Sequence, residues 1–301
     1  LITLRTPFDL GKGPLLRARL FVLGPNDHAL VLCMHHIISD GWSMGVLNKE
    51  LGTLYAAFRS GRPAELYELP IQYADYAIWQ REWLTGEVEA LQLAYWSEKL
   101  SGAPAAIDLP TDRPRPPVPS HRGARKPFVI APEIADALKE LARREGVTLF
   151  MVMLAALDVL LHRYTGQDDI VVGSPIANRG RMETEGLIGF FVNTLVLRNA
   201  VSGEQTYRDH LHQVKETCLG AYAHEDLPFE RLVAELAPER DMSRSPLFQV
   251  MLVLQNVPDE AMALPGLKLG SLGTESVTAK FDLLLSVVER GGKLGGSLEY
   301  A

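Results

Sequence analysis

A run of prolines near the middle of the chain constrains its fold more than any other feature. The segment LPTDRPRPPVPS, residues 109–120, contains five prolines. Proline lacks a backbone N–H and fixes its φ angle, so this segment cannot lie inside a helix or a central strand. We therefore expect an extended linker at 109–120 that joins two compact parts, residues 1–108 and residues 121–301.

The length and composition of the chain suit two such parts. It has 301 residues, 47% of them hydrophobic and 22% charged, and compact domains commonly hold about 100–200 residues each. A net charge of −7 and scattered arginines, apart from short clusters at 122–126 and 179–181, argue against a nucleic-acid partner.

Neither a membrane nor a disulfide framework is indicated. The longest apolar runs, such as residues 150–157, are far shorter than the roughly 20 residues that a membrane span needs. Cys33 and Cys218 are the two cysteines, one in an apolar run and one in a helical pattern, and a reducing cytoplasm fits that usage.

Helical and strand patterns alternate along the whole chain. Residues 28–36, HALVLCMHH, include six consecutive apolar residues, as in a strand buried on both faces. Apolar residues then recur at helical spacing from 46 to 58, with Ser43 as the expected N-cap and Gly61 beyond the end. Further helices are expected at 71–100, 132–144, from Thr148 to Gly166, from Thr206, and in 226–236; further strands at 128–130, 170–173, 190–198, 248–255 and in a glycine-containing hairpin at 280–300. This mixture predicts layered α/β structure.

The turn after the first strand carries the side chains with recognisable chemistry. Residues 34–42, MHHIISDGW, place His35 beside His36 and Asp40 four residues further on. Turns at the ends of buried strands commonly carry reactive groups in α/β proteins. A neutral imidazole is the side chain best suited to accept a proton near pH 7.

Three interpretations of this turn remain open from the residues alone. The histidines can be ordinary strand-end residues, with Asp40 at the entry of the helix. A metal site is a second interpretation, weakened because adjacent strand residues such as His35 and His36 point to opposite faces. The third is a histidine base for acyl transfer without a covalent nucleophile, because the chain has no G-x-S-x-G motif and neither cysteine lies in a polar turn.

Residues 34–43, MHHIISDGWS, resemble the HHxxxDG signature of condensation domains of nonribosomal peptide synthetases, within the chloramphenicol acetyltransferase-like superfamily. Four more blocks resemble those of the family, in the family's order: YADYAIWQREWL at 73–84, IGFFVNTLVLR at 188–198, HEDLPFE at 224–230 and RDMSRSPLFQV at 240–250. The family's two earliest blocks and its C-terminal tail are absent. Together with an opening that lacks methionine and a close within a strand pattern, this predicts a fragment, which we expect to be poorly soluble or inactive by itself because an incomplete lobe exposes apolar surface.

The resemblance implies a pseudo-dimer of two α/β lobes with a central tunnel between them. It implies that the domain itself binds no cofactor, because its substrates are carried on the phosphopantetheine arms of an upstream donor and a downstream acceptor peptidyl carrier protein, beside an adenylation domain in the cytoplasm. The free α-amine of the acceptor aminoacyl thioester attacks the donor aminoacyl or peptidyl thioester, which makes the domain an amide-forming acyltransferase.

By the same resemblance, His36 is the active-site histidine, which either takes the proton of the attacking ammonium or stabilises the charged tetrahedral intermediate. Asp40 is expected to be structural and to pair with Arg198, Arg240 or an arginine in the missing N-terminal part, because a buried carboxylate needs such a partner. Gly41 is expected to allow close backbone approach to the tunnel. For His35 we expect a hydrogen-bonded position inside the fold.

Two residues of the later blocks are candidates for lining the tunnel. Asn193 either stabilises a buried strand end or faces the tunnel. Ser245 stands where the family commonly has asparagine, and a serine keeps a hydroxyl but lacks the amide.

Related classes differ at the histidine motif and its flanks. Heterocyclisation domains carry aspartate where this chain has His35 and His36, and epimerisation domains continue the motif differently from the WSMGVL of this chain. The sequence of the motif and its flanks therefore favours the type that takes an L-configured donor. The alternatives are a non-catalytic docking module and a free-standing acyltransferase that uses coenzyme A. The retained histidine counts against the first, and the number of synthetase-type blocks counts against the second.

Overall fold

The computed structural model describes residues 6–236, 241–255, 264–270, 272 and 278–301. The chain divides into two compact units. Unit 1 is formed by Leu1–Gln80, Ala177–Val192 and Val257–Ser271; unit 2 by Arg81–Ile176, Asn193–Asn256 and Leu272–Ala301.

This division differs from the predicted lobes 1–108 and 121–301. The proline-rich segment 109–120 lies within unit 2, as do residues 81–108. The reason is apolar burial: Trp96, Leu100 and Ile107 belong to the main core of unit 2. Residues 109–120 contain no helix or strand, as predicted, and Arg115 fixes them to unit 2 by an ion pair with Asp282.

In unit 1, strands β1 (Leu16–Gly24) and β2 (Asp27–Met34) form an antiparallel two-stranded sheet. The expectation that the second strand is buried on both faces is wrong, since every residue of β2 is half-buried or exposed. A strand in a two-stranded sheet pairs with one neighbour, so it is not enclosed by other strands. Side chains of the partner strand β1, such as Leu20 and Val22, are largely exposed as well.

Helix α2 (Gly41–Ser60) follows β2 after a short 3-10 helix, η1 (His36–Ile38). Its N-cap is Asp40 instead of the predicted Ser43, because the Asp40 carboxylate accepts the Ser43 N–H in the capping position. The predicted end is confirmed: Gly61 adopts a left-handed conformation with φ 65°.

The single helical pattern expected at 71–100 forms two helices, α3 (Tyr73–Trp83) and α4 (Gly86–Leu100). The chain breaks at Leu84 and Thr85, and Gly86 takes a φ of 57°, which glycine adopts at little cost. Helix α7 (Met182–Glu185), also in unit 1, is short.

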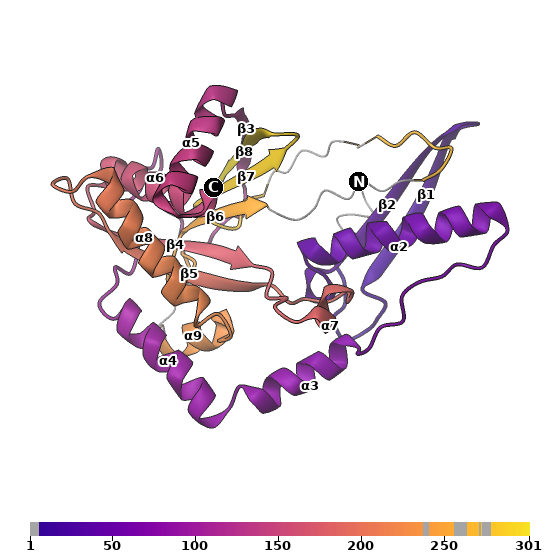
Figure 1. Ribbon diagram of the computed structural model, residues 1–301, viewed down its shortest axis with the longest axis horizontal. Coiled ribbons are helices and arrows are strands. Elements are labelled where there is room, and N and C mark those ends of the chain that lie inside the picture. The colour runs from indigo at the N-terminus through magenta and orange to yellow at the C-terminus, as the bar shows by residue number, and fades with distance from the viewer. Residues whose placement is uncertain (1–5, 237–240, 256–263, 271, 273–277) are drawn as a thin grey trace. The chain divides into compact units, whose positions relative to one another are not determined.

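Unit 2 is built on a six-stranded sheet with the order β3-β8-β7-β6-β4-β5 (Figure 1). The pairs β4–β6 and β6–β7 are parallel and the others antiparallel. Helices α5, α6 and α8 pack against this sheet, and α9 contacts β5. The bounds are β3 Ala124–Val129, α5 Pro132–Glu145, α6 Leu149–Thr165, β4 Asp169–Ile176, β5 Asn193–Ala200, α8 Tyr207–Tyr222, α9 Phe229–Leu236, β6 Val250–Gln255, β7 Leu283–Arg290 and β8 Lys293–Tyr300.

Local sequence signals explain the ends of these elements. Thr148 and Thr206 cap α6 and α8 by accepting backbone N–H groups, and Gly166 ends α6 with φ 72°, all as predicted. Gly291 and Gly292 join β7 to β8 with φ values of 56° and 78°, the two positive angles that a tight hairpin turn needs.

Among the described residues, no single helix is both long and apolar enough to cross a membrane; α5 and α6 meet that test only together, as a pair bent by 107°.

Candidate active site

The two histidines of the motif lie where β2 gives way to η1. His35 precedes the 3-10 helix as its N-cap, and its Nδ1 accepts a hydrogen bond from the Ile37 N–H at 3.1 Å. The side chain is half-buried and lies edge-on to Phe8, with ring centroids 6.1 Å apart. Through this contact and its N-cap position, His35 helps to shape the turn.

His36 differs from its neighbour in exposure. His36 is exposed, and its ring lies edge-on to the Phe190 ring at a centroid distance of 5.4 Å and an interplanar angle of 84°. An imidazole in this position is accessible to a substrate while one side of it contacts an aromatic ring. Proton exchange with a bound substrate is therefore open to His36.

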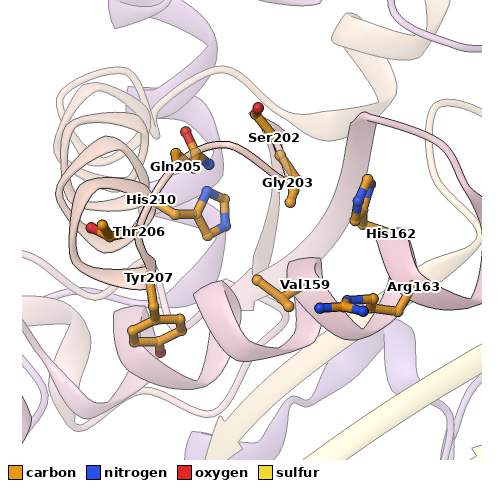
Figure 2. Close-up of a pocket in the computed structure, with 10 residues that line it drawn as sticks. Val159, His162, Arg163, Ser202, Gly203, Gln205, Thr206, Tyr207 and His210 are labelled. Atoms are coloured by element: carbon orange, nitrogen blue, oxygen red, sulfur yellow. The ribbon is translucent and has the colours of Figure 1, made fainter.

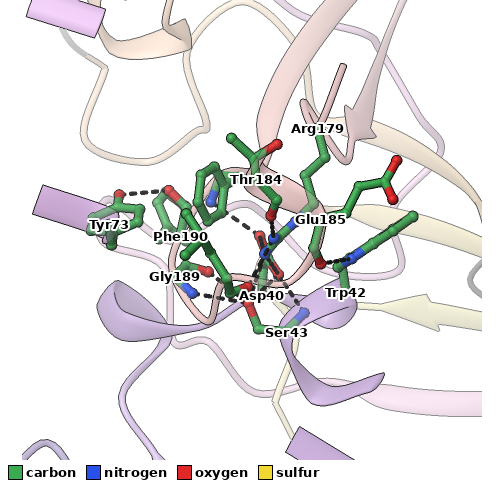
Figure 3. Close-up of polar contacts among 11 residues, drawn as sticks. Asp40, Trp42, Ser43, Tyr73, Arg179, Thr184, Glu185, Gly189 and Phe190 are labelled. Atoms are coloured by element: carbon green, nitrogen blue, oxygen red, sulfur yellow. Dashed lines mark hydrogen bonds and ion pairs between the residues drawn. The ribbon is translucent and has the colours of Figure 1, made fainter. Parts of the chain in front are cut away.

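Asp40 and Arg179 form a buried ion pair beside this turn (Figure 3). Asp40 is 4% exposed and Arg179 8% exposed, and Arg179 Nη2 lies 3.1 Å from Asp40 Oδ1. Ser43 completes the pair: its N–H and hydroxyl donate to Asp40 Oδ1 at 2.8 and 2.7 Å, and its oxygen accepts from Arg179 Nη2 at 2.8 Å. Both charged groups of this network thus receive hydrogen-bond partners, as a buried charge requires, and Arg179 Nε is a buried donor without an acceptor among the described residues.

The network keeps Asp40 ionised. Burial by itself raises the pKa of Asp40, but the hydrogen bonds from Ser43 and Phe191 and the charge of Arg179 outweigh it and hold that pKa below its ordinary value. Burial lowers the pKa of Arg179, yet a guanidinium stays protonated near neutral pH. The Asp40 carboxylate is therefore a fixed anion that holds the turn.

The partner of Asp40 is Arg179, which is none of the candidates expected from the sequence. Arg198 pairs with Asp169 instead, with Nη2 to Oδ2 at 2.7 Å. Arg240 lies outside the described residues. The sequence signal for this partner was the arginine that follows the apolar strand pattern in VVGSPIANRGR. The composition had shown Arg179 only as part of the basic cluster at 179–181.

The segment from Gly189 to Phe191 is held by the same network. The Gly189 N–H donates to the Ser43 oxygen at 3.1 Å, and the Phe191 N–H donates to Asp40 Oδ2 at 3.0 Å. The Tyr73 hydroxyl donates to the Phe190 carbonyl at 2.8 Å. A Cβ at position 189 would overlap the Tyr73 ring, which explains the glycine there.

The block at 73–84 contributes aromatic packing. Tyr76 and Phe191 form a small core with Leu187, and Tyr73 and Trp79 pack against it. This core also contacts the ion pair, because the Arg179 guanidinium stacks over the Phe191 ring at 4.1 Å.

Asn193 is held at the start of β5 by four hydrogen bonds. Asn193 is buried; its Nδ2 donates to the carbonyls of Glu225 and Leu227, and its Oδ1 accepts the N–H groups of Thr194 and Phe229. These four bonds use the full capacity of the amide and favour the structural interpretation over a role in lining a tunnel.

Gly41 and Ser245 show less specific surroundings. Gly41 begins α2, and a Cβ built on it meets no described atom within 4 Å, so the expected close approach is not seen in the part of the chain that the structure describes. Ser245 is half-buried, and its carbonyl accepts a hydrogen bond from Gln249 Nε2 at 2.9 Å.

Unit 2 contains a second polar cluster that the sequence analysis missed. A hollow of about 380 Å³ is lined by residues that include Val159, Thr206 and His210 (Figure 2). Behind it, Asp158 is fully buried, lies 3.5 Å from His210 Nε2 and accepts from Asn199 Nδ2 at 2.9 Å. Burial raises the pKa of Asp158 to about 6. A lone aspartate in the apolar run LAALDVLL was the available signal.

A metal centre finds no support within the residues that the structure describes, where no three His, Cys, Asp or Glu side chains converge on one point.

Comparison with known proteins decides the family. The family model described as condensation domain matches residues 2–301. This chain belongs to the condensation-domain family. Over 298 residues this condensation domain is 55% identical to one of the linear gramicidin synthase proteins of Brevibacillus parabrevis, a match that covers 98% of this chain and 4% of that protein. It is 45% identical over 295 residues to phosphinothricin tripeptide synthetase of Streptomyces viridochromogenes, where it covers 98% of this chain and 27% of that protein.

Solved structures show the same fold. The X-domain from teicoplanin biosynthesis superposes with a TM-score of 0.90 at 31% identity, covering 100% of this chain and 70% of that one. A four-domain nonribosomal peptide synthetase bound to AMP and glycine matches with a TM-score of 0.85 at 28% identity, covering 98% and 23%. The resemblance to condensation domains and the mixed α/β fold class of the chloramphenicol acetyltransferase-like type are thereby confirmed. This condensation domain spans only a small part of the synthetases that it matches.

Proposed function

We propose that this condensation domain forms peptide bonds in nonribosomal peptide synthesis. The observation that carries the proposal is the exposed His36 imidazole, set on a turn that a buried ion pair holds, in a chain 55% identical to part of a linear gramicidin synthase. The α-amine of an acceptor aminoacyl thioester attacks the carbonyl of a donor aminoacyl or peptidyl thioester. A C–N bond forms, the C–S bond breaks, and the donor sulfur leaves as a thiol once it takes up a proton.

His36 acts on the proton or on the charge of this step. The imidazole either accepts the proton that the attacking amine releases or stabilises the charged tetrahedral intermediate. Asp40 and Arg179 hold the turn and take no proton. Holding two tethered substrates in position can itself be worth about 7–11 kcal/mol, so His36 shares the rate enhancement with positioning.

The partners in this proposal are carrier proteins. Upstream donor and downstream acceptor peptidyl carrier proteins deliver the two thioesters on phosphopantetheine arms, next to an adenylation domain, and the domain itself holds no cofactor. The match to a four-domain synthetase supports such neighbours. The motif flanks WSMGVL support an L-configured donor, and the reaction takes place in the cytoplasm.

The test uses the full synthetase that contains this domain. Donor and acceptor carrier proteins are loaded with aminoacyl thioesters, and the acceptor arm is analysed by mass spectrometry for wild type, His36→Ala and the control His28→Ala. We expect dipeptidyl product with wild type and with the control, a large loss with His36→Ala, and less product when the donor is D-configured. Equal product from wild type and His36→Ala would remove the imidazole from the mechanism.

A docking module is the second candidate. The X-domain solved in complex with OxyB from teicoplanin biosynthesis superposes on this chain with a TM-score of 0.87 at 31% identity, covering 98% of this chain and 67% of that one. That similarity favours a domain that recruits a protein partner. Unchanged thioesters on both arms, with several cognate pairs and wild-type protein, would support this candidate over peptide-bond formation.

A further inference from the structure

The contact between Phe190 and His36 joins an exposed imidazole to an aromatic residue whose backbone is hydrogen bonded to buried side chains. The ring of Phe190 meets the His36 imidazole edge-on, with centroids 5.4 Å apart and planes at 84°. This is the arrangement that aromatic pairs prefer. His36 itself belongs to a three-residue 3-10 helix and is exposed.

Three hydrogen bonds anchor the backbone around Phe190. They run from Gly189 to Ser43, from Phe191 to Asp40, and from the Tyr73 hydroxyl to the Phe190 carbonyl, with lengths of 3.1, 3.0 and 2.8 Å. The acceptors in the first two are the buried side chains that also bind Arg179. The segment therefore carries the rigidity of the ion pair to the base of the Phe190 side chain.

The consequence concerns the orientation of the imidazole. An exposed side chain samples several staggered rotamers, whereas an edge-to-face contact with a fixed ring favours one of them. The stabilisation typical of such pairs corresponds to a preference of about 2–10-fold for the contacting rotamer. A reaction that needs the imidazole within a narrow geometry benefits by a similar factor.

We propose that Phe190 is a positioning residue that holds the His36 imidazole in one orientation, and that the anchored segment 189–191 links this ring to the Asp40–Arg179 ion pair. This inference rests on the proposed function in so far as His36 reacts with substrate. Phe190 has no chemical role of its own in it. Tyr73 is part of the same device, because its hydroxyl is the anchor that lies outside the ion-pair network.

The kinetic test compares Phe190→Leu, Phe190→Tyr and the control Phe58→Leu in the full synthetase with loaded carrier proteins. Phe58 lies on α2 in the same unit and is 78% exposed. We expect Phe190→Leu to lower kcat for dipeptide formation about 3–10-fold with little change in KM for the acceptor carrier protein. Phe190→Tyr keeps the ring and should stay within about twofold of wild type, as should the control. Equal kcat for Phe190→Leu and wild type would overturn the proposal.

A second measurement does not depend on peptide formation. The rate at which diethylpyrocarbonate modifies His36 in the same full-length proteins is followed by peptide mass spectrometry, with His28 as an internal reference. Removing the ring in Phe190→Leu should raise the His36 rate while the His28 rate stays constant. If wild type makes no peptide, the proposed function fails, yet the positioning contact stands or falls on this rate.

Tyr73→Phe guards against a variant that fails to fold. It removes one hydroxyl from the anchor and keeps the ring that packs against Phe191. A smaller change than that of Phe190→Leu, in the same direction for both kcat and the modification rate, is expected. No change in either quantity for Tyr73→Phe and Phe190→Leu together would show that the segment does not position His36.

Discussion

Replacing Arg179 by methionine tests whether the ion pair with Asp40 holds unit 1 together. The substitution keeps an unbranched but shorter chain and removes the guanidinium, which leaves the 4% exposed Asp40 carboxylate without its cation. Removing one partner of a buried pair costs about 3–5 kcal/mol. Asp40 retains three hydrogen bonds, from the Ser43 N–H, the Ser43 hydroxyl and the Phe191 N–H, so we expect the lower end, about 3 kcal/mol.

The effect should depend on pH in a defined direction. In wild type the pKa of Asp40 is lowered, so its contribution to stability is present above the unfolded pKa near 3.8 and is lost as pH falls through the folded value. Without Arg179 the carboxylate is uncompensated, and its protonation relieves the penalty. The difference in unfolding free energy between Arg179→Met and wild type should therefore be largest at pH 7–8 and shrink toward about pH 4.

Urea-induced unfolding followed by tryptophan fluorescence measures this difference. Trp42 is a local reporter, since its indole N–H donates to the Glu185 carbonyl at 2.9 Å within the same unit. The matched control is Arg181→Met, which removes an exposed arginine stacked on Trp79 at 4.2 Å and should cost less than about 1 kcal/mol. A loss below about 1 kcal/mol for Arg179→Met, equal at pH 5 and pH 8, would refute the reasoning.

Three further predictions concern single contacts. Burial raises the pKa of Asp158 to about 6, so the neutral carboxyl contributes fully to the stability of the fold below the unfolded pKa of 3.8, and this contribution is lost as pH rises through 6. The wild-type unfolding free energy should therefore fall by about 3 kcal/mol between pH 4 and 7 on account of Asp158. Asp158→Asn should remove most of that fall, as measured by chemical unfolding at a series of pH values. Asn193→Ala leaves the buried carbonyl of Leu227 without its donor and should lower the unfolding free energy by about 1–3 kcal/mol. Gly189→Ala places a methyl group against the Tyr73 ring and should lower the melting temperature at a cost of about 1–3 kcal/mol, whereas an unchanged melt would mean that the segment moves freely.

Local signals in the sequence predicted most of the regular structure of unit 2. Thr148 and Gly166 bound a strongly apolar helix, and the two glycines after Arg290 suit a hairpin, because caps and tight turns depend on a few neighbouring residues. The helix expected across 71–100 failed for the same kind of reason: Gly86 adopts a left-handed conformation that ends one helical path and begins another.

Long-range pairing could not be obtained in this way. The motif indicated that Asp40 is structural, yet its partner Arg179 is 139 positions away. A single sequence shows Arg179 as a member of a basic cluster but does not show which carboxylate it pairs with. The division into compact units does not fall at 109–120 for a related reason: Trp96 and Leu100 join the core of unit 2 through contacts that the composition of the segment after them does not show.

The interleaved course of the chain sets an order for folding during synthesis. Unit 1 is formed by the segment that ends at Gln80 and by Ala177–Val192 and Val257–Ser271, and the first stretch of unit 2 is made between the first two of these segments. At about 5–20 residues per second, the ribosome adds Arg179 roughly 5–20 s after α3. During that interval Asp40 is without its guanidinium, so the turn that carries the two histidines lacks the ion pair that holds it in the finished domain.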